Sequence, residues 1–220
     1  MFKLQEIRKA AMDFRYLLDR GYPRRASLDL IGNRYQLDSD ERHLLHRGIF
    51  SKKDSLSRLK KKIPLKELKN KTIAIDGYNV LITLEAGLSG RPLILGDDGF
   101  IRDISGLSKN YKPSKKTEEA LNLIFEILIK FKPNYILFLF DSPISRSGEL
   151  AREVRESLSK KNLQGSALVL KVPESILIGF KGVVASSDTA IIDHSKAVID
   201  LAGDILKKKK LVKFALRMRY

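Results

Sequence analysis

The chain has 220 residues, of which 43% are hydrophobic, and this length suits one large domain or a medium domain with a smaller one. Its 42 Lys and Arg residues outnumber 26 Asp and Glu residues, which gives a formal net charge of +16. Such an excess favours a polyanionic partner, either nucleic acid or an anionic membrane surface. A Lys-rich, thermophile-like surface explains many charges, but it does not explain so large an imbalance between the two signs.

The composition also excludes several classes of protein. No apolar run approaches the roughly 20 residues that a membrane-spanning helix needs, and the first 20 residues carry charge throughout, unlike a signal peptide. We therefore expect a soluble, cytoplasmic protein with no membrane partner. The absence of Cys excludes disulfides and thiolate metal sites.

The first segment, residues 1–66, has the pattern of a basic helical module. Apolar side chains recur at helical spacing before Gly21, and a short helix over residues 26–31 precedes another that Asp38 or Ser39 caps. The pair resembles a helix-turn-helix, although any small helical bundle produces the same pattern. A basic linker helix is predicted over residues 52–69.

Positive charge is concentrated in this first third. Residues 1–70 hold 18 Lys and Arg against 9 Asp and Glu, a net charge of +9, whereas the remaining 150 residues carry a net +7. We therefore divide the chain into a basic module, residues 1–66, and a second domain, residues 67–220. A run of charge is more often a solvated face, so the division supports a binding module without establishing one.

Strands and helices alternate from residue 71 onward. This alternation predicts an α/β domain with a parallel sheet and helices on both of its faces. An insertion contains a predicted hairpin over residues 91–105 whose turn is Gly96 to Gly99, and the polar residues 106–116 follow it. The predicted strands are 72–75, 135–140, 167–172, 182–185 and 211–216. One predicted helix begins at a cap on Thr117, and two others cover 147–161 and 194–208.

Three of these strands end on an aspartate: Asp76, Asp141 and Asp188. Asp193 lies about one helical turn after Asp188 and can reach the same cleft. The carboxyl ends of strands in a doubly wound sheet meet at one edge, so the carboxylates would repel one another unless a cation or protons compensate them. Oxygen ligands without Cys favour Mg²⁺ or Mn²⁺, which suits phosphodiester hydrolysis. The plainer interpretation is that each acid caps the following helix.

The segments AIDGYNVLI, LFLFDS and VASSDTAIID, in this order, resemble the PIN/NYN-like nuclease superfamily over about residues 70–216. With the basic helical module in front, the layout resembles a prokaryotic, mainly archaeal family of PIN-like proteins of unknown function. The resemblance implies five parallel strands in a Rossmann-like three-layer domain, an acidic pocket for Mg²⁺ or Mn²⁺, and cleavage of RNA or structured DNA. It assigns catalysis and metal binding to the same four aspartates, with Asn79 and Ser187 in support. PIN-like domains often self-associate, which leaves a homodimer open, although the sequence identifies no interface.

Two departures from that family leave alternatives open. PIN-like sites often include a carboxylate on a helix between the first and middle strands, and Glu85, Glu118 and Glu119 are all candidates. The hairpin acids Asp97, Asp98 and Asp103 are not part of the common pattern. They either join the site or build the turn, and we favour the turn because Asp-Gly is a strong hairpin signal.

Basic and aromatic residues are candidates for contacts with nucleic acid. For each of them a solvated surface position is an equal alternative. Tyr22, Tyr35 and Tyr111 lie among basic residues and can stack on unpaired bases, although Tyr35 better fits the helical core. His43 and His46 fit surface or packing positions better than metal sites. The basic candidates are Arg91, Arg102, Arg146, Lys60, Lys61 and Lys62.

Together these features predict a metal-dependent ribonuclease. The main alternative is a non-catalytic binding factor for ribosomal or transfer RNA whose pocket is vestigial. A phosphatase or nucleotide hydrolase is less favoured, because the charge exceeds what a small substrate requires and no Gly-rich phosphate loop is present.

Overall fold

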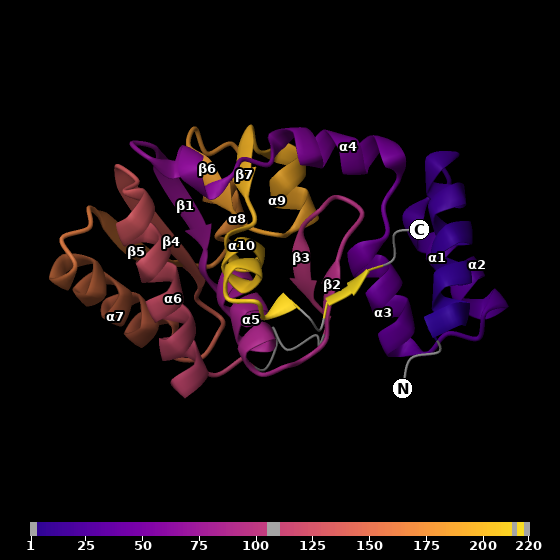
Figure 1. Ribbon diagram of the computed structural model, residues 1–220, viewed down its shortest axis with the longest axis horizontal. Helices are drawn as coiled ribbons and strands as arrows, with labels where there is room; N and C mark the ends of the chain where they lie inside the picture. Colours follow the sequence, from indigo (N-terminus) through magenta and orange to yellow (C-terminus); the bar gives the residue numbers. More distant parts are fainter. Residues whose placement is uncertain (1–3, 105–110, 213–214, 218–220) are drawn as a thin grey trace.

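A computed structural model describes residues 4–104, 111–212 and 215–217, the last three as backbone only. It has a helical module at one end and an α/β domain at the other, with a short hairpin between them (Figure 1). The helical module comprises α1 (Leu4–Asp19), α2 (Arg24–Arg34), α3 (Ser39–Gly48) and α4 (Lys52–Lys61), and a 3₁₀ turn (Leu65–Leu68) leads into the sheet.

The α/β domain confirms the predicted fold class. Its central sheet has five strands in the order β5-β4-β1-β6-β7, and every neighbouring pair is parallel. The strands are β1 (Thr72–Asp76), β4 (Tyr135–Asp141), β5 (Gly165–Leu170), β6 (Val183–Ala185) and β7 (Ala197–Ile199). The helices are α5 (Gly77–Leu88), α6 (Lys115–Phe131), α7 (Ser147–Lys160), α8 (Glu174–Leu177), α9 (Thr189–His194) and α10 (Leu201–Lys208).

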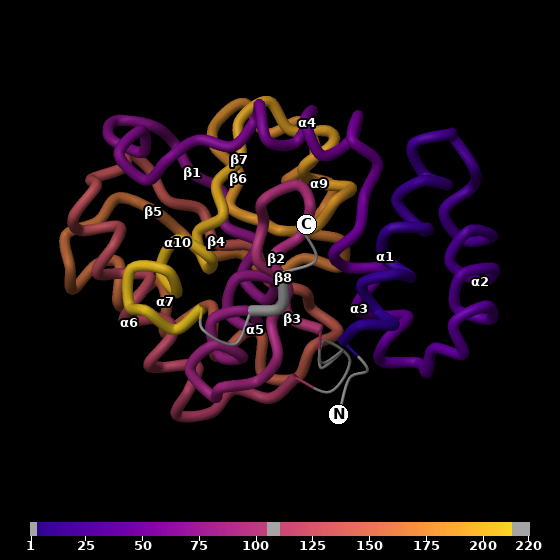
Figure 2. The backbone as a smooth tube through the Cα atoms, turned by 45° about the vertical axis from the view of Figure 1, so that its right-hand side comes forward, coloured from indigo at the N-terminus to yellow at the C-terminus, as the bar shows by residue number. Residues whose placement is uncertain are grey.

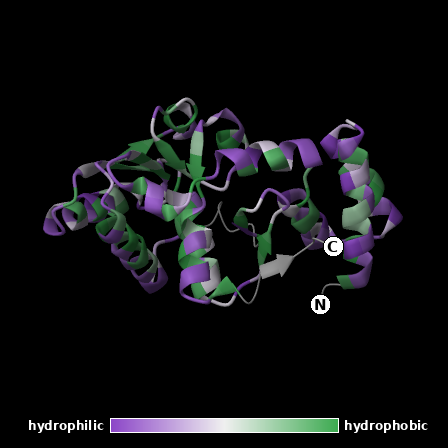
Figure 3. Ribbon diagram, turned by 45° about the horizontal axis from the view of Figure 1, so that its top comes forward, coloured by the Kyte–Doolittle hydropathy of each residue, from purple (hydrophilic) through white to green (hydrophobic). Residues whose placement is uncertain are grey.

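Alternation along the strands separates the two faces of the sheet. Ile73 and Ile75 point into the large core under α5, α6, α7 and α10, whereas Ala74 faces a smaller core with α8 and α9. Figure 3 shows these strands as the most hydrophobic part of the chain, with polar residues outside. The domain is therefore a three-layer arrangement in which both faces of the sheet are buried.

The predicted hairpin is confirmed, and it joins the two parts of the molecule. β2 (Leu93–Leu95) and β3 (Ile101–Asp103) are antiparallel, and β8 (Ala215–Arg217) pairs with β2 in the same small sheet. Ile94 and Ile104 complete the core of the helical module, beside Leu44 and Leu45 of α3. Figure 2 shows α3 next to this hairpin. The module is thus packed against the rest of the chain through a shared core.

Several predicted boundaries are wrong. The helix predicted over 194–208 contains β7, because Ala197 to Ile199 form a buried strand too short to interrupt the helical pattern visibly. The linker helix ends at Lys61, before Pro64. Ser114, not Thr117, is the N-cap of α6. The C-terminal strand covers 215–217 and belongs to the small sheet; residues 105–110 and 213–214 lie outside the described residues.

Candidate functional site

The sheet topology brings the strand-end acids to one edge. β1 lies between β4 and β6, and the strand order reverses there, at the place where open α/β sheets bind ligands. Asp76 ends β1 beside Leu139 of β4, and Asp141 is the last residue of β4. Asp188 follows β6 after two serines.

A pocket of about 360 Å³ opens at this edge, and we call it the carboxylate pocket. The three predicted acids line it together with two further carboxylates, Asp103 of β3 and Glu174 of α8. Glu174 was missed by the sequence analysis, although it follows the carboxyl end of β5 as the other acids follow theirs. The remaining lining residues are His43, Arg47, Tyr78, Asn79, Ile82, Thr83, Ile144 and Ile191.

Asp76 is the most deeply buried of the predicted acids, with 9% of its surface exposed. It occupies the N-cap position of α5, but its side chain makes no capping hydrogen bond to the described part of that helix. The Ser186 hydroxyl donates to its Oδ2 at 2.8 Å. Burial raises the pKa of Asp76 to about 7, and the charges of Asp188 and Asp141 add to the rise. The Ser186 hydrogen bond and a weaker contact with the backbone N–H of Asn79 oppose it. Capping is therefore only a weak part of the role of Asp76, because its contact with the first turn of α5 falls short of a hydrogen bond.

Gly77 allows the close approach on which this geometry depends. A Cβ atom at this position would lie 2.3 Å from Cε1 of Phe140 and 2.8 Å from the carbonyl oxygen of Leu139. The start of α5 thus packs directly on β4, and any larger side chain would force the two apart. Close packing of helix on strand is therefore the reason why this position is a glycine.

Asp141 and Asp188 have different local roles. Burial raises the pKa of Asp141, and the neighbouring charge of Glu174 adds to the rise. Asp188 does cap a helix: its Oδ1 accepts from the backbone N–H of Ala190 at 2.8 Å and of Ile191 at 3.2 Å. The plainer interpretation is thus correct for one of the three strand-end acids, although Asp188 also lines the pocket.

A chain of hydrogen bonds fixes the loop that carries Asp188. Oδ1 of Asn79 accepts from the backbone N–H of Ser187 at 2.9 Å and from its hydroxyl at 3.0 Å. The backbone N–H of Asp188 donates to Oγ of Ser186, which itself donates to Asp76. Asn79 and Ser187 therefore hold the ends of β1 and β6 together.

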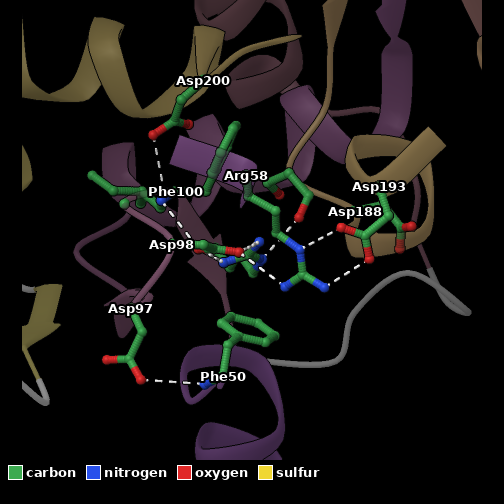
Figure 4. A network of polar contacts seen from close by, with 12 residues as sticks. Phe50, Arg58, Asp97, Asp98, Phe100, Asp188, Asp193 and Asp200 are labelled. Carbon is green, nitrogen blue, oxygen red and sulfur yellow. Dashed lines mark hydrogen bonds and ion pairs between the residues drawn. The ribbon is translucent and has the colours of Figure 1, made fainter. Parts of the chain in front are cut away.

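Asp193 lies elsewhere, which corrects its grouping with the other aspartates. It is not among the described residues that line the carboxylate pocket. Its two carboxylate oxygens accept from Nε of Arg58 at 2.7 Å and from Nη2 at 2.8 Å (Figure 4). Asp193 lies near the end of α9, one turn from the N-cap Asp188, and there it pairs with Arg58 of α4.

The candidates for an additional carboxylate are also placed outside the pocket. Glu85 is buried and accepts hydrogen bonds from Tyr111 and from Thr117, so Tyr111 is buried as well and does not offer a free ring for stacking. Glu118 lines a different hollow, beside α7. Glu119 pairs with Lys116 on the surface.

The three hairpin acids divide between the turn and the pocket. Asp97 pairs with Arg15 of α1 at 2.8 Å. Asp98 is fully buried and accepts two hydrogen bonds from Arg102, at 2.8 and 2.7 Å. Only these two support the turn, because Asp103 lines the pocket.

Most of the predicted nucleic-acid contacts are occupied within the protein. Arg102 is 1% exposed and also donates to the carbonyl of Ser187 at 2.8 Å, so a surface role for it is wrong. Lys61 donates to backbone carbonyls of α9, and Lys62 pairs with Asp200. Arg146 pairs with Glu149 on the surface, Arg91 is half-buried before β2, and Lys60 is exposed.

Sequence reasoning missed the basic wall of the pocket. His43 and Arg47, one turn apart on α3, line it, whereas His46 is exposed and is not among the lining residues. Only the fold reveals this, because α3 is brought to the sheet edge by its packing on the hairpin. The same packing leaves only Ser39, Asp40 and His46 of α3 exposed, so the helix does not present an open face to a nucleic-acid groove.

The donor set of the pocket suits a hard cation but does not form a complete cage. Its acidic ligands are carboxylates only, which fit Mg²⁺ or Mn²⁺. Within the described residues, no three His, Cys, Asp or Glu side chains are grouped so that they could hold one ion. One or two carboxylates with substrate phosphate oxygens make a common Mg²⁺ site, so the residues fit an ion that binds together with its substrate.

The fold and pocket define a three-layer α/β protein with an acidic site at the switch point of its sheet. The chain belongs to the family described as domain of unknown function DUF5616, whose model matches residues 65–204. Residues 6–61 match a second model, protein of unknown function DUF434. An uncharacterized protein of Methanocaldococcus jannaschii, MJ0935, is 37% identical over 208 residues, covering 92% of this chain and 99% of that protein.

No solved structure matches the chain. Among the described residues, no helix combines the length and the apolar composition needed to cross a membrane.

Proposed function

We propose that this protein is a metal-dependent nuclease of the PIN-like type that acts on RNA. The observation that carries the proposal is the state of Asp76. It is a buried strand-end carboxylate at the switch point, with its pKa raised to about 7 beside two further carboxylates. Among the described residues, no Lys, Arg or His donates a hydrogen bond to it. A group perturbed in this way is a candidate for function.

The sheet supports this proposal in a second way. Five parallel strands in the order β5-β4-β1-β6-β7 agree with what the PIN-like resemblance implies, and Asp76, Asp141 and Asp188 line one pocket. A divalent ion bound there would supply Lewis-acid activation of water and charge stabilisation. Asp76 and Asp141 would hold the ion, Asp188 would assist, and Asn79 and Ser187 would keep the loop in place.

Nucleic acid is the favoured substrate class because of the charge, and the PIN-like resemblance favours RNA among nucleic acids. The net charge of +16 accommodates a polyanion better than a small acidic molecule. A non-catalytic RNA-binding factor is the second candidate, and one observation favours it: no ready-made group of three metal ligands exists among the described residues. The two functions differ in whether the carboxylates are needed for a chemical step.

The test is cleavage of a labelled pool of structured RNAs and single-stranded DNAs in Mg²⁺, in Mn²⁺ and in EDTA. We expect metal-dependent cleavage of RNA that falls by more than about 100-fold in Asp76→Asn, since even partners outside the first coordination shell usually contribute 10- to 100-fold. Asp193→Asn is the matched control, because it makes the same chemical change one turn beyond Asp188 but outside the pocket.

The outcomes separate the two candidates. Cleavage retained by Asp193→Asn and lost in Asp76→Asn supports the nuclease. Tight RNA binding by every variant, with no cleavage in any metal, supports the binding factor. Cleavage that persists in EDTA would contradict the assignment of the pocket.

A further inference from the structure

The helical module places positive charge inside the carboxylate pocket. Arg47 and His43 come from α3, yet they line the same cavity as Asp76, Asp141 and Asp188. The position of α3 is fixed at both ends. A capping box of Asp38 and Glu41 sets its start, and at its end Gly48 is packed so closely that a Cβ atom there would lie 2.0 Å from Ile94 of β2.

Arg47 differs from the two buried arginines near it. Arg102 binds both oxygens of Asp98, and Arg58 binds both oxygens of Asp193, so each guanidinium has a bidentate carboxylate partner. Arg47 donates only from Nε, to the backbone carbonyl of Asp103 at a long 3.4 Å. Nη1 and Nη2 have no hydrogen-bond partner within the described parts of the chain.

The surroundings of Arg47 act on the charge of its guanidinium group, whose Nη1 and Nη2 atoms have no hydrogen-bond partner among the described residues. Burial lowers the pKa of Arg47, the charge of Arg102 lowers it further, and Asp188 and Asp103 oppose them. Arg47 is half-buried, and its two terminal nitrogens are open to the pocket, where a ligand could pair with them. Its planar fork matches two oxygens of a phosphate, and arginine is the usual residue for such bidentate recognition.

We propose that Arg47, assisted by His43, is the phosphate clamp of this site. It would bind a phosphodiester group of the nucleic-acid substrate opposite the carboxylates. This inference rests on the proposed function and assigns the recognition of the substrate phosphate to the helical module. The two matched segments, residues 6–61 and 65–204, then build one site between them, and neither is complete alone.

A plainer role for Arg47 is to neutralise Asp103 and Asp188 within the fold. The two roles differ in what the loss of Arg47 affects. A clamp affects the affinity for substrate and requires the fork geometry, so Lys replaces it poorly. A neutralising charge affects stability, and Lys replaces it well.

The experiment measures binding of a labelled single-stranded RNA by fluorescence anisotropy in Mg²⁺. It uses the full chain in the Asp76→Asn background, so that cleavage does not interfere. Arg47→Gln and Arg47→Lys are compared with Arg25→Gln, which removes the same charge from an exposed position on α2. We expect Kd to rise about 10- to 100-fold in Arg47→Gln, as for loss of a charge-assisted hydrogen bond, nearly as much in Arg47→Lys, and less than about 2-fold in Arg25→Gln.

Two further measurements identify the kind of phosphate that is bound and keep the test decisive if one variant does not fold. A 5′-mononucleotide as competitor distinguishes a terminal phosphate from an internal phosphodiester: strong competition assigns the clamp to a terminal phosphate. His43→Gln keeps the test valid if Arg47→Gln does not fold, as judged by circular dichroism. Because His43 shares the wall, we expect a rise in Kd of about 3- to 10-fold from the loss of one neutral hydrogen bond.

The inference and the proposed function fail separately. If the wild-type protein cleaves RNA and Arg47→Gln alone leaves kcat/KM and Kd within 2-fold, the clamp is wrong while the nuclease stands. If no RNA is cleaved but Arg47→Gln weakens binding and Arg25→Gln does not, Arg47 is a phosphate clamp and the protein is an RNA-binding factor, not a nuclease. Equal weakening by Arg47→Gln and Arg25→Gln would show bulk charge and overturn the clamp.

Discussion

Two groups of aspartates in this protein have opposite electrostatic surroundings. Asp98 is fully buried, and burial alone would raise its pKa, but Arg102 and Arg58 hold the pKa below its usual value. Asp76 is buried to a similar degree, and its pKa is raised to about 7 because hydroxyl and backbone groups, not arginines, are its partners. The two are linked through the loop after β6, because Arg102, the partner of Asp98, also donates to the carbonyl of Ser187, and the adjacent Ser186 donates to Asp76.

The difference indicates the role of each group, where the Asp98 group is Asp98 with Asp193 and the Asp76 group is Asp76 with Asp141 and Asp188. The Asp98 group joins the hairpin, α4 and α9 through complementary charges (Figure 4). The Asp76 group is left with uncompensated negative charge at the ligand-binding edge of the sheet, where a cation or a proton must complete it. The paired acids are therefore neutralised within the fold, so that breaking a pair is costly, whereas the unpaired acids lower stability at the edge that forms the site.

The largest effect is expected from Asp98→Asn. Removing this charge leaves Arg102 and part of Arg58 buried without their counter-ion, and breaking a buried pair in this way costs about 3–5 kcal/mol. Urea unfolding at pH 7 measures the free energy of unfolding. Asp29→Asn, an exposed position on α2, is the control and should leave the midpoint unchanged. A loss below about 1 kcal/mol would show that the ion pairs are replaceable.

Asp76→Asn should have the opposite sign. An aspartate with a raised native pKa keeps its proton while the unfolded chain loses it, so the wild-type protein becomes less stable as pH rises from about 4 to about 7. The amide mimics the protonated acid and can still accept from Ser186. In EDTA at pH 8 the variant should be more stable than wild type by up to about 4 kcal/mol, and equally stable near pH 3.5.

Unfolding curves at several pH values measure this difference. Asp141 keeps its own raised pKa in the variant, so part of the decline between pH 4 and pH 7 remains. A wild-type stability that is flat over this range would contradict the buried, uncompensated state of Asp76. Asp193→Asn, whose parent carboxylate is paired with Arg58, should not flatten the curve.

Divalent metal should reverse the destabilisation. If Mn²⁺ replaces the proton on Asp76, saturating metal at pH 8 stabilises the wild-type protein by about 2.7 kcal/mol when its free concentration is 100 times Kd. Asp76→Asn should lose most of this gain, and the gain should shrink at pH 5 as protons compete. Thermal unfolding with Mn²⁺ and with EDTA measures it, and an equal gain in the variant would place the metal elsewhere.

The contrast also separates what the sequence could predict from what it could not. Long, strongly patterned elements such as α6 and β4 were predicted. The apolar residues of α6 recur at helical spacing, and those of β4 form one continuous run. β7 was hidden because a three-residue strand between two helices does not disturb helical spacing. Asp200, which ends that strand and caps α10, was therefore missed as a fourth strand-end acid.

Within the site, the sequence identified acids but not their partners. Asp76, Asp141 and Asp188 follow predicted strands, so topology alone brings them together. Whether an acid is paired depends on contacts between residues far apart in the chain, such as Arg58 with Asp193. Arg47 was missed for the same reason, because the packing of α3 on the hairpin carries no local signal.

The smallest effect is expected from Asp193→Asn. Its side chain is 43% exposed, so solvent weakens its attraction to Arg58, and Asp98 still compensates that arginine when Asp193 is neutral. We expect a loss of about 1 kcal/mol in the free energy of unfolding, unchanged stabilisation by Mn²⁺, and unchanged RNA cleavage. Urea unfolding and the cleavage assay measure these together. A loss of metal-dependent stabilisation would return Asp193 to the site, because a residue that only joins α9 to α4 has no means of affecting the metal selectively.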